Sequence, residues 1–283
     1  MNQLIATLFA GILLAAGWCG IAAAGPWEDG MAAYHRGDNV EAMRLLRPLA
    51  EAGNADAQNV LGQIYKYGGS ALKDVAQAQA WFSKAIDSYR SAADQGDAHA
   101  QASLGMMYRD GDGLPKDYAQ AIAWLRKAAE QGLADAQFQL GLMYANGRGV
   151  SQDYAQAAAW YRKAAAQGKP GAQLMLGEIY ETGRGAQQDL AQAFSLYRAA
   201  AEQGVQQAQF DLGRMYADGR GVQQDYVRAY MWLFSAALLS ESDKLRDQSY
   251  EHRDLVAAKM TPAQIAEAQR LTHEWIAAHP FAR

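Results

Sequence analysis

The stretch that decides the fold runs from residue 132 to residue 167 and reads GLADAQFQLGLMYANGRGVSQDYAQAAAWYRKAAAQ. The same 36-residue pattern occurs in four copies, which begin at Gly96, Gly132, Gly168 and Gly204, and a copy with seven extra residues begins at Gly53. A fixed period of this size is typical of helical solenoids, in which each unit buries its apolar surface against the next. The pattern therefore predicts an all-α protein, a right-handed α-solenoid or superhelix of stacked helix–turn–helix repeats.

Each repeat is predicted to contain two helices. In the first helix Ala136, Leu140 and Tyr144 recur four residues apart, which places them on one helical face. Gly141 lies within the same helix in every copy, although an interior Gly costs about 1 kcal/mol relative to Ala. Its repetition indicates the close approach of a neighbouring helix. The second helix begins with a pattern Asp-x-x-Gln at Asp153, a variant of the capping box.

These residues carry a family resemblance. The run A-x-A-Q-x-x-L-G-x-M-Y-x-x-G-x-G-V-x-Q-D-Y-x-x-A-x-x-W-Y-x-K-A-A-x-Q-G resembles the Sel-one-like repeat family, relatives of the tetratricopeptide repeats, over residues 53–239. The copy at Gly168 departs from the pattern, with Leu190 and Leu196 where Tyr and Trp are usual. The resemblance implies a non-enzymatic scaffold that binds a protein or peptide partner, in signalling, envelope assembly or host contact.

The repeat register predicts the organisation of the whole chain. Residues 1–24 are expected to form a signal peptide, 25–52 an N-terminal capping helix hairpin, and 240–283 C-terminal capping helices. The five repeats are expected at 53–95, 96–131, 132–167, 168–203 and 204–239. Seven residues amount to about two helical turns, so the insertion should lengthen the second helix of the first repeat without changing its buried face. The end of that helix should then project past its neighbours.

The N-terminal segment predicts export. Residues 4–24 carry no charged side chain and end in Ala22-Ala23-Ala24, a small-residue site at which a signal peptidase would cut. The expected location is therefore periplasmic or secreted. The alternative is an uncleaved inner-membrane anchor, because the apolar run approaches the roughly 20 residues that span a bilayer. Membrane contact is expected only in that case.

Composition excludes several classes of function. The net charge is -4 and the pI is about 5.7, with no stripe of Lys or Arg, so we expect no nucleic-acid partner. The five His residues show no metal-ligand spacing, and no cofactor motif is present, so we expect neither metal nor cofactor.

The candidate binding residues lie on a stripe of the first helix that varies between repeats. Counted from the first Gly of each repeat, offsets 3, 7, 10 and 14 share one face, away from the repeated Ala, Leu and Tyr. We call these positions the variable stripe and expect them to line the concave surface as a groove. The alternative is that they are merely exposed positions without a packing role. The candidates for ligand contact are His99, Ser103, Met106, Asp135, Gln139, Leu142, Met175, Glu178, Asp211 and Arg214.

Two other features could carry chemistry. Ser70 and Lys73 match the Ser-x-x-Lys string of β-lactamase-like and cell-wall enzymes, but the Ser-Asp-Asn and Lys-Thr-Gly partners of that string are absent. A hydrolase using this pair is the enzymatic alternative. The Gly-x-Gly loops hold one Arg per repeat, at Arg148, Arg184 and Arg220, which would form a ridge able to attract anions.

Overall fold

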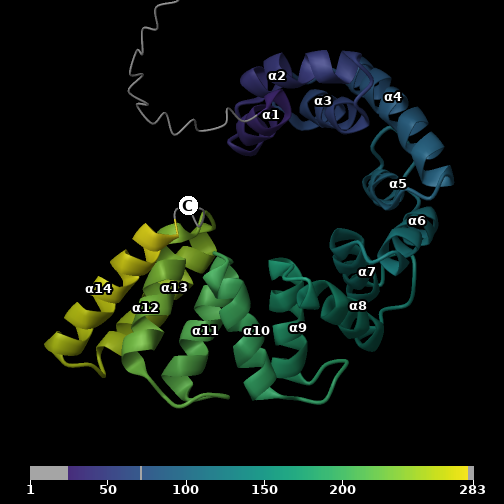
Figure 1. Ribbon diagram of the computed structural model, residues 1–283. Helices are drawn as coiled ribbons and strands as arrows, with labels where there is room; N and C mark the ends of the chain where they lie inside the picture. The colour runs from purple at the N-terminus through teal and green to yellow at the C-terminus, as the bar shows by residue number, and fades with distance from the viewer. Residues whose placement is uncertain (1–24, 71, 280–283) are drawn as a thin grey trace, which may run out of the picture.

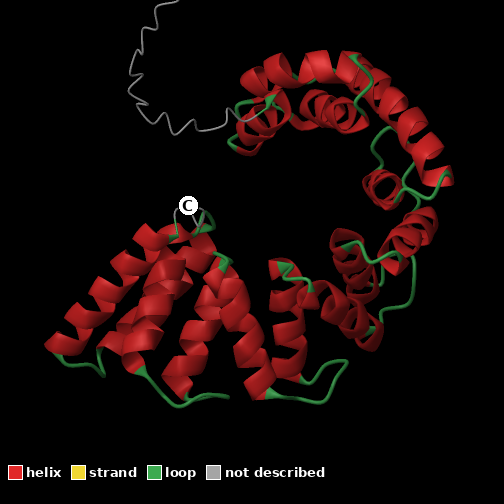
Figure 2. Ribbon diagram, viewed as in Figure 1, coloured by secondary structure: helices red, strands yellow, loops and turns green. Residues whose placement is uncertain are grey.

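The computed structural model describes residues 25–70 and 72–279, and it confirms the all-α class. Over these ranges the chain forms helices joined by loops and contains no strand (Figure 2). The helices are α1 Pro26–His35, α2 Asn39–Glu51, α3 Ala55–Tyr67, α4 Val75–Asp94, α5 Ala98–Asp110, α6 Tyr118–Glu130, α7 Ala134–Asn146, α8 Tyr154–Ala166, α9 Pro170–Thr182, α10 Leu190–Glu202, α11 Gln206–Asp218, α12 Tyr226–Leu239, α13 Asp243–Ala257 and α14 Pro262–Ala278. The expected signal peptide at 1–24 lies outside the described residues.

The helices begin where the sequence provides side-chain caps. The second helix of each repeat starts after an Asp whose carboxylate accepts the backbone N–H three residues on; at Asp153 the acceptor distance to Gln156 N is 2.9 Å. These bonds satisfy N–H groups that have no partner within the helix. The last helix, α14, has the predicted capping box, in which Thr261 and Gln264 bond reciprocally.

The two helices of each repeat pack at the repeated Gly. A Cβ built on Gly141 would lie 2.5 Å from the ring of Tyr161, which is buried. Any side chain at Gly141 would therefore separate α7 from α8. The same contact, always with a side chain 20 residues later, recurs in the pairs Gly62/Phe82, Gly105/Leu125, Gly141/Tyr161, Gly177/Tyr197 and Gly213/Leu233. The close approach predicted from the sequence is confirmed.

Consecutive repeats are joined by the repeated Gln. The amide of Gln137, which is buried, donates to Ala129 O in the last turn of α6 at 3.0 Å. Gln167 in turn donates to Gln137 Oε1 at 2.8 Å. Because a buried amide must find partners, this position fixes how one repeat sits on the previous one. The same bond is made by Gln58 to Ala50 O, Gln101 to Ala93 O and Gln209 to Ala201 O.

The stack follows a curved path from α1 to α14 (Figure 1). In this view α3 and α5 lie on the inner side of the curve, and α4 and α6 lie on the outer side. The buried side chains form clusters that follow the stack rather than one central core. The hairpin of α1 and α2 covers the first repeat, while α13 and α14 pack against α12 at the other end. Both ends are thus closed as terminal repeats require.

The insertion lengthens one helix as predicted. Helix α4 has 20 residues, whereas α6 and α8 have 13 each, so α4 is seven residues longer. Its buried face is continuous, because Trp81, Phe82, Ala85, Ile86 and Tyr89 are all buried. Seven residues at 1.5 Å per residue correspond to about 10 Å along the helix axis. This length displaces the second repeat relative to the first.

Candidate binding surface

The variable stripe connects neighbouring repeats through polar contacts. On α3, Asp56 accepts hydrogen bonds from Tyr89 Oη at 2.6 Å and lies 3.0 Å from His99 Nε2 of α5. The hydrogen bond to His99 is the main cause that holds the pKa of Asp56 below its usual value, and it raises the pKa of His99. Further along the stack, Gln139 of α7 accepts a bond from Arg109 of α5.

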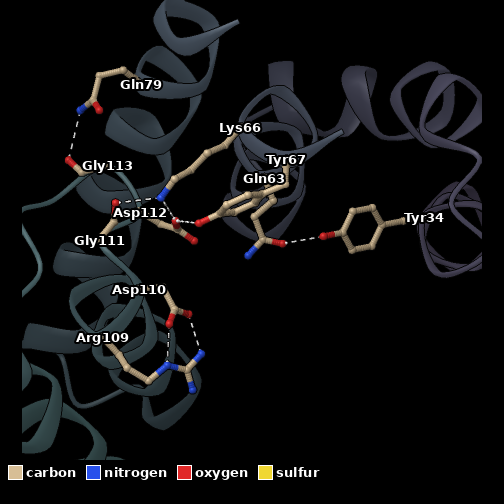
Figure 3. Close-up of polar contacts among 10 residues, drawn as sticks. All are labelled: Tyr34, Gln63, Lys66, Tyr67, Gln79, Arg109, Asp110, Gly111, Asp112 and Gly113. Atoms are coloured by element: carbon tan, nitrogen blue, oxygen red, sulfur yellow. Dashed lines mark hydrogen bonds and ion pairs between the residues drawn. The ribbon is translucent and has the colours of Figure 1, made fainter. Parts of the chain in front are cut away.

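The next junction carries an ion pair. Asp135 at the start of α7 pairs with Lys169, the residue that precedes α9. At the N-terminal end, Tyr34 of α1 donates to Gln63 Oε1 of α3 at 3.0 Å (Figure 3). These contacts join neighbouring repeats through stripe residues. They give Asp135, Gln139 and His99 partners within the stack, whereas one alternative from the sequence was that such positions have no packing role.

Two predicted stripe residues are buried in the stack. Ser103 is 4% exposed and Asp211 is 7% exposed, so offset 7 faces other helices at these repeats. Three predicted candidates, Met106, Leu142 and Met175, form an apolar strip that is half-buried, and all three pack against buried core residues. These three side chains therefore contribute both to packing between helices and to the surface of the stack.

An acidic cluster lies where α9 meets α11. Asp211 accepts bonds from Gln207 at 3.0 Å and from Arg214 at 3.4 Å. Burial raises the pKa of Asp211 to about 6, despite these two donors. The pKa of Glu178, which is raised by burial and by the charges of Asp211 and Glu181, is about 7. The stripe thus holds two carboxyl groups that titrate near neutral pH.

The loops form a second polar edge, and their arginines are mostly engaged. Arg220 donates to Glu181 Oε1 at 2.7 Å, and Arg184 donates to Tyr154 Oη at 3.3 Å while covering its ring. Arg148 is exposed. An anion-binding ridge across all three loops, as considered from the sequence, is not favoured by these contacts.

At the junction of the first two repeats, an ion pair equivalent to that of Arg220 with Glu181 has its charges exchanged. Lys66 Nζ of α3 lies 2.6 Å from Asp112 Oδ1 and 3.0 Å from Gly111 O (Figure 3). Tyr67 Oη donates to the same carboxylate oxygen at 3.0 Å. Lys66 occupies the same offset as Glu181, and Asp112 the same offset as Arg220. One clasp geometry is thus built with opposite charges at two junctions.

Ser70 and Lys73 lie in the loop between α3 and α4 rather than on a helix. Ser70 is exposed, and no hydrogen bond joins its hydroxyl to Lys73 in the described part of the chain. A Ser nucleophile needs a base within hydrogen-bonding reach, and the structure shows no such contact between these two residues.

Within residues 25–70 and 72–279, no group of three or more His, Cys, Asp or Glu residues is arranged to hold a metal ion. Over the same residues, no helix is both long and apolar enough to cross a bilayer.

The fold and its inter-repeat contacts define an α-solenoid repeat protein. The model of the Sel1 repeat matches residues 55–88, 98–133, 134–169, 170–205 and 206–240, which together make up more than half of the chain. The chain belongs to the Sel1 repeat family. Sel1 repeats generally form non-catalytic scaffolds that mediate protein–protein interactions.

A solved structure supports the fold, and others are similar in sequence. The chain is similar to a Sel1 repeat protein from Oxalobacter formigenes, with 32% identity, a TM-score of 0.63, and coverage of 90% of this chain and 99% of that one. It is also similar to a protective antigen of uropathogenic Escherichia coli with an SLR fold, at 26% identity, a TM-score of 0.44, and coverage of 91% and 77%. A sel1 repeat protein from Klebsiella pneumoniae gives 25% identity, a TM-score of 0.44, and coverage of 75% and 97%. The comparison with curated proteins finds no match.

The raised pKa values predict a pH dependence of stability. Asp211 and Glu178 hold protons in the folded protein at pH values where the unfolded chain has released them. Their contribution to stability is therefore fully present below about pH 4 and is lost as the pH rises through about 6 to 7. We expect the melting temperature of Asp211→Asn to fall less between pH 5 and pH 8 than that of the wild type. Calorimetry at both pH values measures this difference.

The matched control is Asp218→Asn, at an exposed position on the same helix. This variant should keep the wild-type pH dependence. An unchanged pH dependence in Asp211→Asn would show that the buried carboxyl is not the titrating group.

Proposed function

We propose that this protein is a non-enzymatic scaffold of the cell envelope or secreted space, which binds an extended protein segment along the inner face of its solenoid. The observation that carries the proposal is the half-buried apolar strip of Met106, Leu142 and Met175 on consecutive first helices. Contiguous apolar surface flanked by polar groups is the usual anatomy of a recognition site.

Polar groups at both ends of the strip fit the same function. On one side His99 is exposed and paired with Asp56, and on the other Arg214 is paired with Asp211. A partner segment would bury its apolar side chains at the centre and exchange hydrogen bonds at the ends. Because the stripe residues are held by contacts between repeats, the surface is already ordered before a partner arrives, which lowers the entropic cost of binding.

A hydrolase at Ser70 and Lys73 is the other candidate. No observation favours it, because the pair lies in a loop and the remaining motifs of such enzymes are absent from the sequence. The general role of the family as a non-catalytic scaffold supports the binding function instead.

The inner face can be tested by site-specific photo-cross-linking in the native cell. A photoreactive amino acid at Asn146, exposed at the end of α7, should give a discrete adduct with the partner, while one at Ala123, exposed on α6, should not. The double change Met106→Gln with Leu142→Gln should reduce the adduct at least tenfold, because amides at the centre of the strip are costly to desolvate.

The control for this test is Ala123→Gln with Glu130→Gln, two equivalent changes on α6. It should leave the adduct unchanged, and circular dichroism should show wild-type helical content in both double variants. An adduct of equal yield from Ala123, or one that survives the double change in a folded protein, would place the partner elsewhere.

The proposed location follows from residues 1–24. Export with cleavage after Ala24 predicts that the mature protein begins at Gly25 and is recovered in the periplasmic or secreted fraction. Mass spectrometry of the N-terminal peptide measures this directly. Recovery from the membrane with residues 4–24 intact would favour the anchored alternative, and a cytoplasmic protein that retains Met1 would contradict export.

A further inference from the structure

The extra length of α4 shifts the second repeat along that helix. In the later repeats, the second Gly of each loop packs on the first residue of the previous repeat's second helix: Gly149 on Tyr118, Gly185 on Tyr154 and Gly221 on Leu190. In the second repeat the equivalent Gly113 packs on Phe82, which is seven residues beyond the start of α4 at Val75. The loop thus lies two turns further along its supporting helix than at any of those three junctions.

This shift leaves the start of α4 uncovered. Val75 is 71% exposed, whereas its equivalents Tyr118, Tyr154, Leu190 and Tyr226 are all partly buried. Tyr67, at the end of α3, is 61% exposed as well. Two large apolar side chains are therefore left open to solvent at the one junction where the repeat is interrupted. At the other junctions the next loop fills the equivalent space.

We call the uncovered start of α4, beside the end of α3 and the loop after α5, the step. A pocket of about 450 Å³ lies there. Its walls come from α3, from the first two turns of α4 and from the loop after α5, and the lining residues are Lys66, Tyr67, Lys73, Val75, Ala78, Gln79, Phe82, Gly111 and Gly113. Pockets that bind small ligands or single side chains with their backbone typically measure roughly 300–1,000 Å³. Gly113 packs directly on α4 in the pocket wall, since a Cβ there would lie 2.4 Å from Phe82 Cβ.

The far wall of the pocket is held by hydrogen bonds and an ion pair. Lys66 bonds to Gly111 O and Asp112, Tyr67 bonds to Asp112, and Gln79 donates to Gly113 O at 3.1 Å (Figure 3). Asp112 is buried and is neutralised by Lys66. These bonds connect both repeats across the step, so the pocket does not depend on a partner for its shape.

The rim carries one cation without a partner among the described residues. Lys66 is paired with Asp112, and the carboxylate of the neighbouring Asp74 accepts the backbone N–H of Gln77 at 3.0 Å. Lys73 is exposed and lines the pocket, and its ammonium group forms no ion pair or hydrogen bond in the described part of the chain. The pocket therefore offers apolar and aromatic walls beside a single available ammonium group. Its complement is an apolar side chain next to a carboxylate.

We infer that this step is a second binding site, separate from the inner face, which takes an apolar or aromatic side chain of a partner peptide with an adjacent carboxylate paired to Lys73. The ring of such a residue lies against Tyr67, Val75 and Phe82, while its carboxylate, from a chain end or an acidic neighbour, reaches the ammonium group. A peptide bound both here and on the inner face would gain affinity from the two linked contacts.

The smallest probe with this chemistry is N-acetyl-phenylalanine, compared with its uncharged amide. Titration of isotope-labelled protein should shift the backbone amide signals of Val75, Gln79, Gly111 and Gly113, with the acid binding at least fivefold more tightly than the amide. Lys73→Gln should weaken binding of the acid to the level of the amide. Val75→Glu should abolish both, and because Val75 is exposed this variant should fold.

Lys244→Gln, at an exposed Lys on α13, provides a matched charge control and should bind the acid like the wild type. The proposal is overturned if neither probe shifts these signals, if the shifts are spread over the surface, or if Lys73→Gln leaves acid binding unchanged. A dimer in sedimentation that Val75→Glu dissociates would also overturn it, because a second copy would then fill the step. None of these results depends on the cross-links from Asn146. The titration therefore tests the pocket independently of the test of the inner face.

Discussion

The contact between an interior Gly of each first helix and a side chain 20 residues later holds the two helices of every repeat together. At Gly141 the absence of a Cβ lets the ring of Tyr161 lie directly on the backbone of α7. A helix without Gly there would be more stable alone but could not approach its partner as closely. The recurrence of this residue in five repeats is therefore a packing requirement. It sets the distance between helices on which the stack and its surfaces depend.

Phe82 shows how this rule produces the one irregular junction. The ring of Phe82 packs against the backbone of Gly62 in its own repeat, as in the other repeats. Its Cβ packs against Gly113 of the next repeat. At the three later junctions the loop Gly packs on the first residue of the second helix. The contacts with the loop Gly and with the Gly inside the first helix are therefore made by two different side chains. Seven added residues preserve the helical face because they make about two full turns. They move the second repeat along α4 without disturbing the core, and they leave a pocket at the surface.

Much of the fold could be predicted from the sequence, because a repeat multiplies each local signal. The Asp caps, the Thr261 box, the glycine contact and the length of α4 all follow from residue types at fixed spacing. The role of the repeated Gln could not be predicted, since its bond to the previous repeat is visible only once the stack is formed. The position of the second repeat along α4 could not be predicted for the same reason. Sequence spacing gives the added length, but it does not show which part of α4 the next repeat packs against.

The candidate site was less predictable than the fold. Helical spacing predicts that the variable stripe shares one face, yet it does not show that Asp211 and Ser103 are buried or that Gln139 bonds to Arg109. These facts depend on how each repeat stacks on the previous one, which decides the side chains that meet between first helices. Pairwise matching between repeats, as in the reversed charges of Lys66 with Asp112 and Arg220 with Glu181, leaves no periodic signal.

The most direct measurement is the unfolding free energy of Gly141→Ala, compared with that of Gln156→Ala at an exposed position of α8. Helix propensity alone would make the Gly141 variant more stable by about 1 kcal/mol. A Cβ 2.5 Å from the buried ring of Tyr161 should instead destabilise the protein by about 1–3 kcal/mol, the usual cost of overpacking, while Gln156→Ala stays within about 0.5 kcal/mol of the wild type. Chemical denaturation measures both values. A Gly141→Ala variant that unfolds at a higher denaturant concentration than the wild type would contradict the close contact between α7 and α8.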